Sequence, residues 1–262
     1  MKISSLVLMT VTLLLTSCLE IKSTITVNKN GTAIIEENIV LGVQLASMVG
    51  GDQGGQFRSL VMTDEKAAER AKKLGEGVTV KSREEMKTAD GKSGVKVVYA
   101  VADLTKLKYV PFEPEQESTS TPPTEPMTFA LSGSSLTITN PEVDKKRGGG
   151  RGTMTKPQKT PEQLAMMKAQ LGMMKPMLAG MHMVVEVKGA DGIASSDAAY
   201  LSEGTISFMD MDLDKVMENP DNFTSFMEAT NNGISIADAA VQFSKVEGLK
   251  FEGKKVVKVE LK

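Results

Sequence analysis

Alternating apolar and polar runs joined by glycine turns constrain the fold of this chain more than any other feature. One face of the first run carries Ile21, Ser23, Ile25 and Val27. The turn Asn28-Lys29-Asn30-Gly31 follows, and a second run covers residues 32–41. Asn-Gly tolerates positive φ at both positions, so this pattern predicts a β-hairpin. Residues 78–86 and 94–104 repeat it around Asp90-Gly91 and predict a second hairpin.

Three helices are expected between the strands. Thr63 caps a helix that ends at Leu74, followed by Gly75, and Ala67 and Ala71 lie on its apolar face. Thr160-Pro161-Glu162-Gln163 forms a capping box for a helix over 160–181, with a stripe of Leu164, Met167, Leu171, Met174, Leu178 and Met181. The third helix covers about 235–245. Further strands are expected at 129–138, 181–189, 204–212 and the C-terminus. The pattern predicts an α+β fold with mainly antiparallel sheet built from hairpins and a few packed helices.

The N-terminus has the features of a cleaved secretory signal peptide. Lys2 precedes an apolar stretch from Leu6 to Leu15, which is too short to span a bilayer. Leu15-Thr16-Ser17-Cys18 then resembles the lipobox of bacterial lipoproteins. The resemblance implies that signal peptidase II removes residues 1–17 and that Cys18 carries a diacylglyceryl thioether and a further acyl chain such as palmitate. Two or more chains anchor a protein stably in a membrane.

Lipidation of Cys18 has consequences for chemistry and for location. Cys18 is the single cysteine of the chain, so a lipidated protein has no disulfide, zinc–thiolate site or cysteine nucleophile. The membrane partner is reached through the lipid on Cys18, which predicts a location in the cell envelope. Position 19 is Leu and not Asp. In lipoproteins of Gram-negative bacteria that feature favours the outer membrane, with the domain in the periplasm or on the surface.

Composition divides the rest of the chain into two regions. Residues 18–110 form a first α+β region, and residues 111–126 form a linker or loop rich in Pro, Glu, Ser and Thr. Residues 127–262 form a second α+β region, and the sequence leaves open whether the two regions are one domain. The second region contains a basic, Gly-rich loop at 144–159, with six basic residues and one acidic residue. We interpret it as a solubilising loop in preference to a contact for lipid heads or polyanions.

Charge argues against a nucleic-acid partner. The chain has 31 basic and 33 acidic residues, a formal net charge of −2. A nearly neutral chain lacks the basic surface that nucleic-acid binding requires.

The methionine-rich sequence around Met181-His182-Met183 is the candidate for cofactor chemistry. Thioethers and imidazole are ligands that suit Cu(I) or Ag(I), which makes a soft-metal site the alternative function. Methionine is also an adaptable core residue, and adjacent strand residues point to opposite faces. We therefore favour core packing and expect no cofactor.

Catalytic motifs are missing from the sequence. The chain has one histidine and no Gly-x-Ser-x-Gly or His-Glu-x-x-His motif. Asp210, Asp212 and Asp214 suggest a cation site, but their alternation with Met and Leu fits a strand that leads into a capped helix better. A hydrolase that uses paired carboxylates stays open as a second alternative. The chain is expected not to be an enzyme.

Three segments resemble a group of bacterial envelope proteins. They are ITVNKNGTAIIEENIVL, GVKVVYAVADLTKL and VVEVKGADGIASSDA. Together with the lipobox they are similar to small lipoproteins of an uncharacterised α+β family, including LppM-type domains. The resemblance implies an α+β fold and a setting in the cell envelope, and it implies no catalytic residue. We expect a lipid-anchored binding or scaffolding module with an envelope protein as partner.

Overall fold

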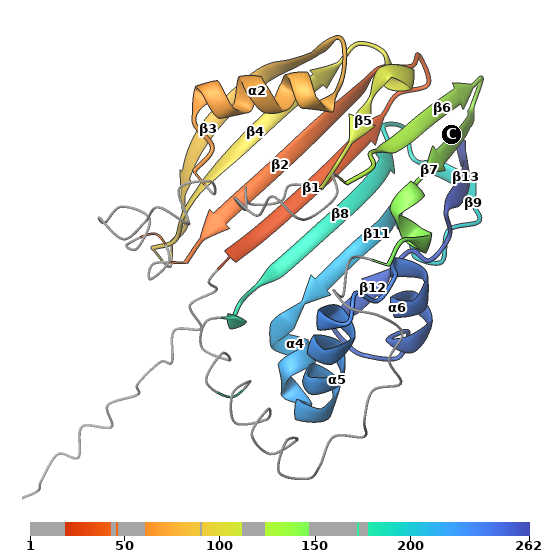
Figure 1. Cartoon of the computed structure of the whole chain (residues 1–262). Coiled ribbons are helices and arrows are strands. Elements are labelled where there is room, and N and C mark those ends of the chain that lie inside the picture. The colour runs from red at the N-terminus through yellow and green to blue at the C-terminus, as the bar shows by residue number, and fades with distance from the viewer. Residues whose placement is uncertain are drawn as a thin grey trace, which may run out of the picture.

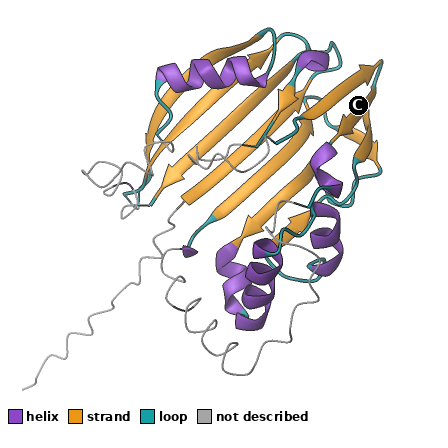
Figure 2. Ribbon diagram, in the orientation of Figure 1, coloured by secondary structure: helices purple, strands orange, loops and turns teal. Residues whose placement is uncertain are grey.

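The computed structural model describes residues 19–42, 46, 61–89, 91–111, 124–146, 172 and 178–262. Strands dominate this part of the chain, and the helices gather in two places (Figure 2). Within these ranges no helix is long and apolar enough to cross a membrane. The signal peptide, Cys18, most of the linker, the basic loop from residue 147 onward and most of the predicted helix over 160–181 lie outside the described residues.

An eight-stranded sheet forms the body of the molecule (Figure 1). Its order is β10-β11-β8-β1-β2-β4-β3, and β12 also pairs with β11. The strands are β1 (Leu19–Val27), β2 (Ala33–Leu41), β3 (Val78–Lys87), β4 (Ser93–Val101), β8 (His182–Gly189), β10 (Leu201–Ser202), β11 (Thr205–Asp212) and β12 (Leu249–Phe251). β1 and β8 run parallel, and the other pairs in this sheet are antiparallel.

A second sheet of five strands has the order β5-β6-β7-β13-β9. The strands are β5 (Lys108–Tyr109), β6 (Met127–Ser132), β7 (Ser135–Thr139), β9 (Ile193–Ser196) and β13 (Val256–Leu261). Two short 3₁₀ helices flank it, η2 (Leu104–Lys106) and η3 (Pro141–Asp144). This sheet and helix α2 (Asp64–Leu74) lie on the same face of the large sheet (Figure 1). The main core fills the space between them, with side chains from β1, β2, β4, β6, β7, β13 and α2.

The predicted hairpin turn fixes the pairing of β1 with β2. The amide of Gly31 donates to the carbonyl of Asn28 at 3.1 Å, and Gly31 has φ +82°. The side chain of Asn30 accepts from the amide of Thr32 at 3.0 Å. This turn sets the register Val27↔Ala33, so Ile25 and Ile35 face the core together. A one-residue slip would move every core residue of β1 to the opposite face.

Helix α2 begins and ends where the sequence predicts. The hydroxyl of Thr63 accepts from the amide of Lys66, and Gly75 follows the last helical residue. Its buried residues are the predicted Ala67, Ala71 and Leu74. This apolar face is small, so α2 depends on polar contacts for its position more than a typical surface helix does.

Three further helices form a separate lobe beside β11 and β12 (Figure 1). They are α4 (Leu213–Glu218), α5 (Pro220–Asn231) and α6 (Ile236–Gln242), and the side chains of Asp212, Asn219 and Ser235 cap them. A second apolar cluster lies within the lobe. Its centre includes an edge-to-face contact of Phe226 with Phe243, with ring centroids 5.6 Å apart.

The predicted fold class is confirmed, since the chain is α+β with mostly antiparallel sheet. The second predicted hairpin is confirmed as β3 and β4, and the last predicted helix as α6. The large sheet takes strands from both predicted regions, because β1 from 18–110 pairs with β8 from 127–262.

Candidate functional site

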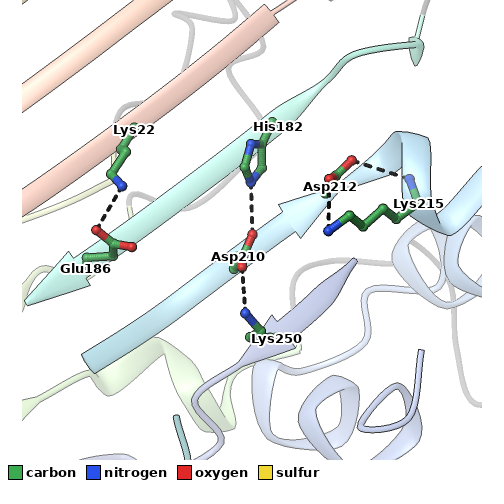
Figure 3. Close-up of polar contacts among 7 residues, drawn as sticks. All are labelled: Lys22, His182, Glu186, Asp210, Asp212, Lys215 and Lys250. Atoms are coloured by element: carbon green, nitrogen blue, oxygen red, sulfur yellow. Dashed lines mark hydrogen bonds and ion pairs between the residues drawn. The ribbon is translucent and has the colours of Figure 1, made fainter. Parts of the chain in front are cut away.

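The structure separates the members of the Met181-His182-Met183 motif. Met183 packs against the main core, and Met181, just before β8, packs against both apolar clusters. His182 points to the opposite face of the sheet, as alternation along a strand requires (Figure 3). The three side chains therefore do not form a joint ligand set.

His182 instead meets a residue from the other candidate group. Its Nε2 lies 2.9 Å from Oδ1 of Asp210 on the neighbouring β11, and Oδ2 of Asp210 accepts from Nζ of Lys250 at 3.0 Å (Figure 3). The register explains the contact, because Asp210 pairs with Lys250 on one side and lies diagonal to His182 on the other. Sequence reasoning did not identify Lys250.

The contact of His182 with Asp210 belongs to a larger polar surface on the large sheet, which we call the polar face. It consists of residues on the four neighbouring strands β1, β8, β11 and β12: Lys22, Glu186, His182, Asp210 and Lys250. Lys22 and Glu186 form a further ion pair across β1 and β8, at 3.1 Å (Figure 3). The side chains of His182 and Asp210 are 37% and 26% exposed. The polar face carries residues of both charge signs, an arrangement that can bind a polar protein surface through hydrogen bonds and ion pairs.

Asp212 and Asp214 each accept a hydrogen bond from a different backbone amide. Asp212 ends β11 and accepts from the amide of Lys215, so it caps α4. Asp214 accepts from the amide of Gly180 at 2.7 Å. Residues 210–214 therefore form the predicted strand that runs into a capped helix. Among the described residues, no group of three or more His, Cys, Asp or Glu side chains is placed to hold a metal ion.

The pKa of Asp210 is lower than the ordinary value of 3.8. Burial alone would raise it, but hydrogen bonds from His182 and Lys250 and the charge of Lys250 outweigh burial. Because the folded pKa lies below the unfolded value, ionised Asp210 stabilises the fold above about pH 4. This contribution is lost as the pH falls through the folded pKa.

Replacement of Asp210 by Asn should therefore destabilise the protein in a pH-dependent way. We expect a loss of about 1 kcal/mol at pH 7, a size typical of a charged hydrogen bond that is partly exposed. The difference between wild type and variant should shrink towards zero as the pH falls below about 4 and through the folded pKa of Asp210. Urea unfolding across this range measures it, with Asp191→Asn in the exposed β8–β9 turn as control. A constant difference at all pH values would contradict the role of the carboxylate charge.

A second polar assembly lies inside the main core. We call it the buried polar cluster: Ser23 of β1, Glu37 of β2, Tyr99 of β4, Tyr109 of β5 and Arg70 of α2. Arg70 Nε donates to Glu37 Oε2 at 2.8 Å, and its Nη2 donates to the carbonyl of Val110 at 2.8 Å. The side chain of Glu37 is 0% exposed and that of Arg70 13%. The pair therefore joins α2 to the centre of the large sheet.

The hydroxyls of this cluster are neutral and buried. Burial raises the pKa of Tyr99 and of Tyr109, and the nearby Glu37 carboxylate raises both further. The Tyr99 hydroxyl lies beside Glu37, and the Tyr109 hydroxyl lies beside Ser23. Sequence reasoning missed this cluster, although one signal was present: Glu37 occupies a core position between Ile35 and Ile39.

Comparisons with known proteins do not assign the chain to a family. No protein-family model matches the chain, and no curated protein sequence matches it. One solved structure, the NMR structure of the folded domain of LppM from Mycobacterium tuberculosis, shows a weak likeness. Sequence identity is 7%, the TM-score is 0.29, and the match covers 75% of this chain and 84% of that one.

Proposed function

We propose that the protein is a lipid-anchored protein of the cell envelope whose folded domain acts as a binding or scaffolding module. The observation that carries the proposal is the junction at residue 18. The lipobox Leu15-Thr16-Ser17-Cys18 ends at the anchor residue. The next residue, Leu19, already belongs to the first strand. This is the arrangement expected when a leader is removed in front of Cys18 and the domain starts there.

The polar face supports binding as the task of the domain. It presents residues of both charge signs on neighbouring strands, where ion pairs join them. Partner proteins recognise such surfaces through complementary charge. We do not extend the proposal to a soft-metal site, because Met183 and His182 lie on opposite faces of β8. Leu19 favours the outer membrane if the host is Gram-negative.

Replacement of Cys18 by Ser should abolish anchoring. We expect the wild type to incorporate labelled palmitate and to sediment with membranes, because two or more acyl chains hold a protein stably. The Cys18→Ser protein should incorporate no label and appear in the soluble fraction. Ser17→Ala is the matched control, since it keeps a small residue before the cysteine. Equal labelling of wild type and Cys18→Ser would contradict the anchor.

Crosslinking in intact cells tests the binding module. Wild type should capture a specific envelope protein, identified by mass spectrometry. Charge reversal at two positions of the polar face, Lys22→Glu with Lys250→Glu, should reduce that capture while the domain remains folded and anchored. Capture that is unchanged by the reversal would place the partner surface elsewhere.

A further inference from the structure

We propose that the end of the large sheet at which β1 begins rests on the phospholipid headgroup layer, and that the opposite end projects away from it. This inference rests on the proposed lipidation of Cys18. We call the two ends the anchor end and the distal end. The interaction surface is the anchor end, and its partner is the bilayer surface itself.

No linker separates the anchor from the sheet. Leu19 already belongs to β1, pairs with Leu41 of β2 and is 8% exposed. Glu20 pairs with His182 of β8 on the other side. Because both neighbours of β1 hold its first residues, the acylated residue lies one peptide unit from a fixed strand, a distance of about 3–4 Å. The domain therefore cannot drift away from the bilayer on a flexible tether.

The register identifies the other chain segments at the anchor end. Leu41 pairs with Ser93 of β4, and Ser93 pairs with Lys87 of β3. The β3–β4 turn at Ala89 thus lies beyond the anchor end on one side of β1. On the other side, His182 pairs with Asp212, which caps α4 near Lys215. Figure 1 shows the start of β1, the start of β8 and α4 at the same end of the sheet.

The distal end lies one strand length away. Val27 pairs with Ala33, which pairs with Val101. β1 has 9 residues. At about 3.3 Å per residue the strand holds the turn at Lys29 roughly 30 Å from the anchor. That distance exceeds the Debye length in physiological salt, about 8 Å, so the distal end does not sense the charge of the membrane surface.

The charges at the anchor end are mixed. Lys87 and Lys92 flank the β3–β4 turn, and Asp212 and Asp214 lie on the α4 side. A polybasic segment is attracted to anionic lipids by about 1 kcal/mol per basic residue. Because the anchor end carries acidic as well as basic residues, its net attraction to anionic lipids is small. The orientation therefore depends on the covalent anchor and the absence of a linker, and should be insensitive to lipid charge.

Single-cysteine labelling tests the orientation in lipidated, full-length protein purified from membranes. Cys18 is the single cysteine of the chain, so an introduced cysteine is the one free thiol once Cys18 is acylated. Ala89→Cys and Lys215→Cys report on the anchor end, and Lys29→Cys reports on the distal end. Each variant carries a fluorophore in phosphatidylcholine vesicles that contain a lipid with a quencher on its headgroup. A second set of variants has a Gly/Ser linker of about 20 residues, with a mean span of roughly 25 Å, between Cys18 and Leu19.

The expected result is strong quenching at positions 89 and 215 and several-fold weaker quenching at position 29. In the variants with the linker, quenching at the three positions should become similar, because the linker lets the domain move away from the membrane surface. Addition of phosphatidylglycerol should not change the pattern. Equal quenching at all three positions in the protein without the linker would overturn the orientation, provided that intact mass shows the acyl groups. An intact mass without acyl groups would overturn the lipid anchor itself, and the inference with it.

Discussion

Replacement of Arg70 by Met is expected to lower the free energy of unfolding by about 3–5 kcal/mol, a loss typical of a buried ion pair that loses one partner. The Glu37 carboxylate is 0% exposed and receives hydrogen bonds from the Arg70 guanidinium. Without Arg70 it would remain as an uncompensated charge beside the Tyr99 and Tyr109 phenols. Helix α2 would also lose its bond to the carbonyl of Val110. Urea unfolding followed by circular dichroism measures the loss.

Two control variants separate the effect of burial from that of charge. Lys96→Met breaks the ion pair of Lys96 with Glu36, whose side chains are 35% and 41% exposed, and should cost at most about 1 kcal/mol. The double variant Glu37→Leu with Arg70→Met removes both buried charges and should recover most of the loss. If Arg70→Met costs no more than Lys96→Met, the buried pair does not hold α2 on the sheet.

Replacement of Gly75 by Ala is expected to destabilise the protein by about 3 kcal/mol or more, through backbone strain and overpacking together. Gly75 ends α2 with φ +137°, a region that residues with a side chain rarely adopt. A Cβ at this position would lie 2.3 Å from the backbone carbonyl oxygen of Lys106. Neither the helix end nor the η2 segment can shift without moving core residues, since Leu74 and Leu104 are buried on both sides.

Gly133→Ala is the control for a glycine with positive φ that has no close neighbour. Gly133 has φ +60° in the β6–β7 turn, and a Cβ there would have no neighbour within 4 Å. Its replacement should cost only the backbone term of about 1–2 kcal/mol. Thermal unfolding of both variants compares the two positions. Equal losses would contradict the additional strain and overpacking expected at Gly75.

The sequence predicts those parts of the fold that depend on neighbouring residues. The Asn30-Gly31 turn sets the β1–β2 hairpin within a few residues, and Thr63 and Gly75 bound α2 by capping. Asp212 caps α4 in the same local way, so the reading of residues 210–214 is confirmed.

Features that join distant residues were not predicted. The parallel pairing of Glu20 with His182 joins segments that no short turn connects, so no local sequence signal predicts it. Periodicity predicts which face of a strand is buried, but it does not predict which strand lies beside it. The contact of His182 with Asp210 depends on that same neighbour relation. Glu37 was assigned to a strand, but its partner Arg70 is one of several charged residues on α2, and the sequence does not distinguish it from the others.

The central position of β1 sets the order in which the molecule can fold. As synthesis proceeds, residues 19–101 can form β1, β2, β4 and β3 through contacts close in the chain. The second edge of β1 stays open until residues 182–189 emerge to pair with it. Contacts between segments far apart in the chain form slowly. An unpaired strand edge can meanwhile form hydrogen bonds with the strands of other chains. We therefore expect the pairing of β8 with β1 to be a late step in folding, and aggregation to compete with folding at the strand edge that β8 covers.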